Sequence, residues 1–163
     1  MSLAVWTLHA LETPRVPRRC PRCDAPRRFV SSGKFRLNAQ KRRIDVWLVY
    51  NCPDCDDRWN APIVERAAPE EIRGYALYQD NDPAAAWSCA FSVPGADLAV
   101  PWRVEREPQS LPLTVELRLA DRMHVRLDRL LAAELGISRA EIARRASGDL
   151  RRPVTHGQVV RIS

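Results

Sequence analysis

Alternating apolar and polar positions predict two strands. Between residues 44 and 50 every second side chain is apolar, and residues 113–119 repeat the same period. A period of two is typical of a strand with one buried face. A further strand is expected over residues 28–37, with Ser31-Ser32-Gly33 as a bulge and residues 38–41 as the turn into the next strand. Together these segments predict a β-hairpin over residues 28–50.

Helical patterns lie in the middle and at the end of the chain. A proline and two acids after Ala68 predict a helix over residues 68–78, and Asp82-Pro83 opens a shorter one over 84–91. Four leucines at i, i+3, i+4 and i+8 predict a helix from Leu127 that Gly136 terminates. Ser138 and the glutamate three residues later form a capping box that opens another helix.

The segments between these helices and the C-terminus are less regular. Proline and glycine interrupt residues 93–112, which are expected to form an irregular connection. Residues 159–162 predict a short final strand.

Composition places the chain among globular proteins. Of 163 residues, 45% are hydrophobic, which is enough for a packed core. No apolar run approaches the roughly 20 residues that span a bilayer, and the first residues lack the basic start of a signal peptide, so a cytoplasmic location is expected. The net charge of +6 is uneven, because residues 126–163 hold 8 basic and 4 acidic side chains while residues 67–125 hold 5 and 9. Phosphate is therefore a candidate ligand for the ends of the chain.

Two cysteine pairs carry the clearest chemistry. Cys20 and Cys23 form one pair with a two-residue gap, and Cys52 and Cys55 form the other. Each gap allows one tight turn to aim two thiolates at a single ion, so the pairs predict a closed tetrahedral site for one structural Zn²⁺. The alternative is two disulfides or one redox pair, although no thioredoxin-like βαβ pattern surrounds either pair.

Residues 29–66 resemble a bacterial zinc-ribbon family of unknown function. The similarity is carried by residues 29–41, by residues 44–50, by the second cysteine pair and by Trp59-Asn60. The resemblance implies two knuckles joined by a hairpin whose open end the metal ties. It implies no activity, because the family has none established.

Residues 126–147 resemble the alpha-L RNA-binding motif of a small-subunit ribosomal protein, tyrosyl-tRNA synthetase and pseudouridine synthases. The matching positions include Arg126-Leu127-Asp128, Leu135-Gly136 and Ser138-Arg139. By that resemblance Arg126 and Arg139 are expected to contact structured RNA. Further phosphate partners would be Arg144, Arg145, Arg151 and Arg152. The chain departs from the motif after residue 147, where the usual Asn-Gly turn is missing, and the alternative is a solvated arginine face.

The remaining candidates are weaker. Cys89 lies in an apolar stretch and is interpreted as a buried free thiol. The scattered histidines (His9, His124 and His156) suggest no shared site. Trp47 and Trp59 are interpreted as packing residues, with base stacking as the alternative. No nucleophile motif, phosphate loop or paired acids are present, so we expect no enzyme.

The sequence thus predicts an α+β protein in three parts. These are a Cys₄ zinc ribbon over residues 1–66, a helical and irregular connector over 67–122 with a strand near 113–120, and an alpha-L-like module over 123–163. The expected function is a non-catalytic RNA- or ribosome-associated binding module. The alternative is a protein-interaction adaptor that uses the ribbon, with structural C-terminal helices.

Overall fold

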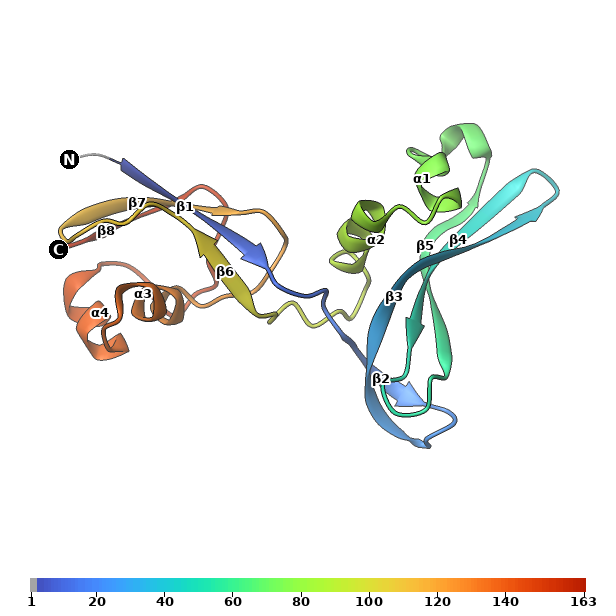
Figure 1. Ribbon diagram of the computed structural model, residues 1–163, viewed down its shortest axis with the longest axis horizontal. Coiled ribbons are helices and arrows are strands. Elements are labelled where there is room, and N and C mark those ends of the chain that lie inside the picture. Colours follow the sequence, from blue (N-terminus) through green and yellow to red (C-terminus); the bar gives the residue numbers. More distant parts are fainter. Residues whose placement is uncertain (1–2) are drawn as a thin grey trace. The chain divides into compact units, whose positions relative to one another are not determined.

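The computed structural model describes residues 3–163 and divides them into two compact units (Figure 1). Residues 13–98 form one unit, called the inserted unit here. Residues 3–12 and 99–163 form the other, called the terminal unit. Each unit contains a four-stranded sheet and two α-helices, which confirms the α+β class. No helix in residues 3–163 is long and apolar enough to cross a membrane.

The sheet of the inserted unit is antiparallel throughout. Its strand order β2-β3-β4-β5 follows the chain. The strands are β2 (Val16–Cys20), β3 (Ala25–Gln40), β4 (Arg43–Asn51) and β5 (Arg58–Ala67). The predicted alternation in β4 is confirmed, because Ile44, Val46, Leu48 and Tyr50 are all buried. These four side chains form the centre of the unit's core.

The predicted irregularity in the first strand of the hairpin is also confirmed. The pairing of β3 with β4 shifts register between Ser31 and Phe35. Gly33 has a φ of +72° at this point, a conformation that suits glycine. The backbone N–H of Phe35 donates to Asn81 Oδ1 at 2.6 Å and so links β3 to the segment between α1 and α2. The bulge therefore lets a 16-residue strand bend toward the helical segment.

The helical segment of the inserted unit differs from the prediction. A single helix over residues 68–78 is wrong, because a 3₁₀ turn, η1 (Pro69–Glu71), is followed by a separate short helix, α1 (Tyr75–Gln79). Gly74, with φ +72°, separates the two elements. The next predicted helix is confirmed as α2 (Pro83–Ala90), capped by Asp82. Both α-helices pack against β3, on the core face of the sheet.

The sheet of the terminal unit has the order β6-β1-β7-β8. Its strands are β6 (Trp102–Glu105), β1 (Leu3–Ala10), β7 (Leu113–Leu119) and β8 (Gln158–Ile162). Strand β1 runs parallel to β7 and antiparallel to β6, so it lies inside this sheet. The predicted strands at residues 113–119 and 159–162 are confirmed, whereas β6 falls in a segment expected to be irregular.

The position of β1 changes the expected division of the chain. The first residues were assigned to the ribbon, but Trp6 and Leu8 are fully buried in the terminal unit. The observed boundaries follow residues 12 and 98, and thus differ from the predicted 66 and 122. The cause is a pairing between β1 and β7, which lie more than 100 residues apart in the sequence.

The C-terminal helix pair is present as predicted. Helix α3 (Leu127–Leu135) buries Leu127, Leu130 and Leu131 and ends at Gly136 in the left-handed conformation. Helix α4 (Arg139–Arg145) begins after Ser138, whose hydroxyl accepts the backbone N–H of Glu141 at 3.1 Å. In Figure 1 both helices lie on one side of the terminal sheet.

The role of β1 gives a testable prediction about fragments. Residues 99–163 alone should not fold, because they lack an internal strand and two fully buried side chains. Residues 1–12 joined by a flexible linker to residues 99–163 should unfold cooperatively on heating, as followed by circular dichroism. Cooperative unfolding of the 99–163 fragment without residues 1–12 would contradict the prediction.

Candidate metal centre and arginine surface

The two cysteine pairs occupy matching turns at one end of the inserted sheet. Each turn has the sequence Cys-Pro-Xaa-Cys-Asp; one joins β2 to β3 and the other joins β4 to β5. The aspartate after each pair, Asp24 or Asp56, has a φ of +52° or +59°. Aspartate tolerates this left-handed conformation better than most residues. The hairpin β3–β4 thus connects the two turns, as the sequence predicts.

The four thiol sulfurs converge at the spacing of a metal shell. All four lie within 4.8 Å of one another; the Sγ atoms of Cys20 and Cys55 are 3.5 Å apart, and those of Cys23 and Cys52 are 3.9 Å apart. Four sulfurs bound tetrahedrally at about 2.3 Å would lie about 3.8 Å apart. A disulfide needs about 2.05 Å, and all five cysteines are free. The cluster therefore fits a metal ion.

Polar groups around the cluster offset its negative charge. The backbone N–H of Cys23 donates to Cys20 Sγ at 3.4 Å. The Arg27 guanidinium forms an ion pair with Asp54 and lies beside Cys23. Arg22 donates from Nη1 to the carbonyl oxygen of Cys55 at 3.3 Å and so links the two turns. These contacts hold the turns together while leaving the sulfurs directed at one another.

The thiols influence one another's ionisation strongly. Burial raises the pKa of Cys20, but hydrogen bonds from the Cys23 backbone and from neighbouring thiols outweigh it and lower this pKa to about 7. The pKa of Cys55 rises to about 12 despite a backbone hydrogen bond near Asp57, because burial and the other three cysteines disfavour its charge. Like charges this close disfavour one another, so a cation among the sulfurs would favour the ionisation of all four thiols.

Three of the six predicted RNA-contacting arginines meet at one surface of the terminal unit. Arg126, Arg139 and Arg151 line an open hollow of about 570 Å³. An adjoining hollow of about 520 Å³ shares Arg126 and Arg139 and adds Arg129. We call these four residues the arginine surface. Sequence reasoning missed Arg129, although its position three residues after Arg126 places both on one side of α3.

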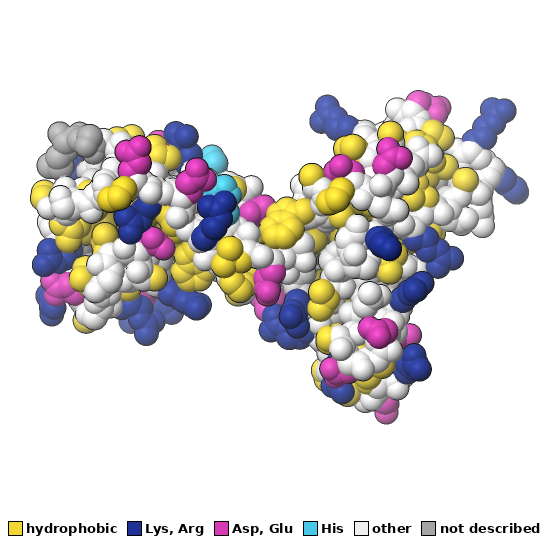
Figure 2. Space-filling view, in the orientation of Figure 1, with side chains coloured by type: hydrophobic (Ala, Val, Ile, Leu, Met, Phe, Trp, Pro, Cys, Tyr) yellow, Lys and Arg dark blue, Asp and Glu magenta, His cyan; other side chains and the backbone are white. Residues whose placement is uncertain are grey.

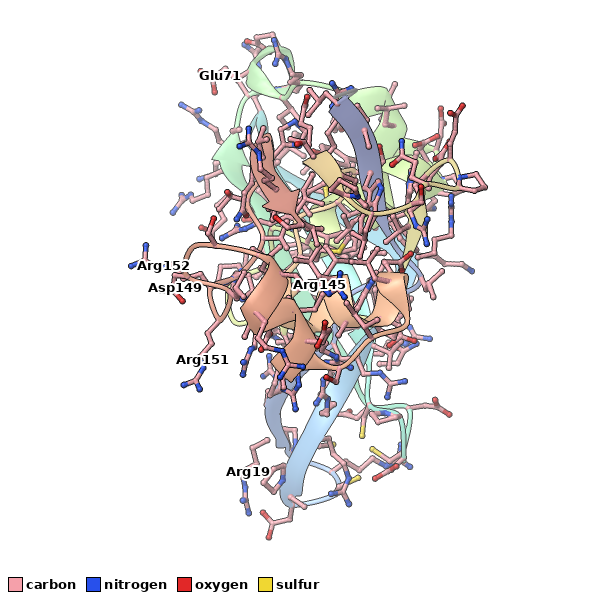
Figure 3. All side chains as sticks on the ribbon, turned by 90° about the vertical axis from the view of Figure 1, so that its left-hand side faces the viewer. Arg19, Glu71, Arg145, Asp149, Arg151 and Arg152 are labelled. Carbon is pink, nitrogen blue, oxygen red and sulfur yellow. The ribbon has the colours of Figure 1, made fainter. Side chains whose placement is uncertain are left out.

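The other three predicted arginines form ion pairs with two nearby carboxylates. Arg144 and Arg145 both pair with Glu141, one turn earlier on α4. Arg152 pairs with Asp149 at 2.9 Å. Figure 3 shows Arg152 beside Asp149, with Arg151 pointing away from both. Arg139 and Arg151 have no ion pair to a carboxylate within the described part of the chain.

Arg126 is held in place by a buried carboxylate. Its Nε and Nη2 donate to the two Asp128 oxygens at 3.1 and 2.7 Å. Asp128 is only 8% exposed, and burial alone would raise its pKa, but these hydrogen bonds keep that pKa below the ordinary value. The Arg126 side chain is still 47% exposed. Its guanidinium therefore lies at the surface in a fixed orientation.

The remaining candidates do not form a second cluster. Among residues 3–163 the four cysteines are the only group of three or more histidines, cysteines and acids with converging ligand atoms. Cys89 is partly buried beside Tyr78, and burial raises the pKa of its thiol. His9 contacts Glu105, and His156 contacts the backbone of Leu119.

The two tryptophans considered for base stacking have different surroundings. Trp59 packs against the core of the inserted unit and lies 5.4 Å from the Tyr50 ring, between ring centroids, which fits the packing interpretation. Trp47 is partly exposed on the opposite face of the sheet, since its neighbours Val46 and Leu48 are the buried residues of β4.

A protein-family model matches residues 37–154, well over half of the chain. The chain belongs to the family "Protein of unknown function (DUF1062)". The part of this chain that matches DUF1062 contains Cys52, Cys55 and the whole arginine surface, and it begins after Cys20 and Cys23. No curated protein and no solved structure matches the chain.

The metal site gives a prediction with an internal control. Cys52→Ser should abolish binding of one metal ion per chain and lower the thermal stability of the inserted unit, because three thiolates leave the shell open. Cys89→Ser, in the same unit but outside the cluster, should keep the full metal content. Elemental analysis and thermal unfolding measure both effects. Equal metal content in the two variants would contradict the assignment.

Proposed function

We propose that this protein is a non-catalytic module that binds structured RNA and is organised by one structural zinc ion. The observation that carries the proposal is the arginine surface, where Arg126, Arg129, Arg139 and Arg151 surround adjoining open hollows. RNA is the partner class because its phosphates carry closely spaced negative charge along a folded surface.

The cysteine cluster supports zinc in a structural role. A tetrahedral shell of four thiolates selects zinc or an iron–sulfur centre, and single ions with four protein ligands are typical of structural zinc. All four ligand positions are filled by sulfur, so water has no place on the ion. Zinc bound here would fix the two turns and, through them, the ends of all four strands of the inserted sheet.

The orientation of the arginines supports phosphate binding. A guanidinium donates two parallel hydrogen bonds to phosphate oxygens, and this geometry favours arginine over lysine. Arg139 and Arg151 form no ion pair within the described residues. Asp128 lines the same hollow near Arg139, but both of its oxygens are bound by Arg126, whose direction it fixes. Surface arginines with paired carboxylates, such as Arg152, contribute less net charge.

The proposal is tested by the salt dependence of RNA binding. The zinc-loaded protein should bind a stem-loop RNA, and its affinity should fall steeply with salt because bound phosphates release counterions. Arg139→Ala with Arg151→Ala should weaken binding and reduce the slope of log K against log salt by about 2, one for each phosphate contact. Fluorescence anisotropy with labelled RNA measures both quantities.

A matched variant separates the arginine surface from general positive charge. Arg144→Ala with Arg152→Ala removes the same charge from the same helix and loop, but from residues already paired with acids. This variant should change the slope less. Equal slopes for the two double variants, or no salt-dependent RNA binding by the unmodified protein, would contradict the proposal. In the second case, a protein partner whose binding depends on the intact cysteine cluster would favour the adaptor alternative.

A further inference from the structure

The inserted sheet has a second face that the core does not use. The strand register places Arg36, Trp47 and Pro62 in one row across β3, β4 and β5. Their side chains point away from the core face, where α1 and α2 pack. Trp47 is partly exposed at the centre of this row, and the Arg36 guanidinium lies 5.9 Å from its ring centroid. That distance is at the outer limit of a cation–π contact, so the ring is not tightly covered.

Positive charge gathers around Trp47. The distal half of the hairpin, residues 34–43, holds five cations and no acid, including both lysines of the chain. An open hollow of about 630 Å³ beside Trp47 is lined by three cations, Lys41, Arg43 and Arg66, and by two acids, Asp45 and Glu65. Figure 2 shows dark blue side chains at the end of this hairpin.

The two acids that line the hollow form no ion pair with the hairpin cations in the described part of the chain. Within residues 3–163, only Arg43 of these hairpin cations has an ion pair, a long one of 3.6 Å to Glu71. Asp45 also lines the hollow, but its Oδ1 accepts the backbone N–H of Arg66 at 2.9 Å. The cations at Lys34, Lys41 and Arg42 are therefore available to an anionic partner.

We propose that this face, centred on Trp47, binds a single-stranded segment of RNA. An unpaired base would stack on the Trp47 ring beside Arg36, and the flanking phosphates would contact Lys34 and Lys41. Aromatic rings on a sheet, bordered by cations, suit single strands because every base presents a stacking face. A duplex hides those faces. The surface therefore differs in ligand from the arginine surface of the terminal unit.

This inference rests on the proposed function only in choosing RNA as the nucleic acid. Its residues belong to the inserted unit and include none of the arginine surface. The two proposals can therefore fail separately.

The test uses the full-length, zinc-loaded protein and a labelled 12-nucleotide oligouridine. Trp47→Ala should weaken binding by about 5- to 150-fold, the loss that one stacked base accounts for. Trp47→Phe should lose less, because it keeps an aromatic ring. Val49→Ala, a matched truncation two residues along the same face of β4, should change the affinity less than twofold. Quenching of tryptophan fluorescence by the oligouridine should be smaller for Trp47→Phe than for the unmodified protein.

Two further ligands, inorganic polyphosphate and the stem-loop RNA, serve as controls. The first separates base stacking from charge, and the second separates the Trp47 face from the arginine surface. Inorganic polyphosphate has no bases, so Trp47→Ala should bind it as the unmodified protein does. The variant with Arg139→Ala and Arg151→Ala should keep its oligouridine affinity, and Trp47→Ala should keep its affinity for the stem-loop.

The inference is overturned if the unmodified protein does not bind oligouridine. It is overturned as well if oligouridine quenches the tryptophan fluorescence of Trp47→Phe as strongly as that of the unmodified protein. It is also overturned if Trp47→Ala, with zinc content and circular dichroism unchanged, binds oligouridine as tightly as Val49→Ala. Loss of stem-loop binding alone would contradict the proposed function and leave this inference standing.

Discussion

The convergence of four thiol sulfurs is the constraint on which the inserted unit depends. Each cysteine turn joins two neighbouring strands, so one ion held by both turns would fix β2, β3, β4 and β5 at the same end. Structural zinc contributes about 10–16 kcal/mol of coupled folding energy in finger peptides. An ion here would add to the stability that the hydrophobic core of this unit supplies.

The two proposed RNA surfaces arise from the same electrostatic rule on different scaffolds. An arginine or lysine attracts phosphate most strongly where no carboxylate neutralises it and where its side chain is held in place. On the terminal unit this rule selects Arg139 and Arg151 over Arg144 and Arg152. On the inserted unit it selects the tip of the β3–β4 hairpin, where Trp47 adds a stacking face.

The sequence predicts the local features of this fold and misses those that depend on distant pairing. Alternation identifies β4, and leucine spacing with Gly136 identifies α3, because both signals lie within one element. Strand β1 begins with four consecutive apolar residues, Leu3 to Trp6, so its alternation is weak in the sequence. Its partner β7 is more than 100 residues away, so its place in the terminal unit is not readable from either segment alone. The left-handed Gly74 divides what reads as one helix.

The same distinction applies to the candidate sites. The cysteine spacing alone indicates the metal cluster, and the ion pairs of Arg144 and Arg152 each join residues three apart in the sequence. The shared hollow of Arg126, Arg139 and Arg151, and the exposure of Trp47, depend on the fold. X-ray absorption at the zinc edge would measure the ligand shell of the cysteine cluster. Four sulfur neighbours at about 2.3 Å are expected around one zinc ion. A shell containing nitrogen or oxygen, or a chain isolated with disulfides and no zinc, would contradict a Cys₄ zinc site.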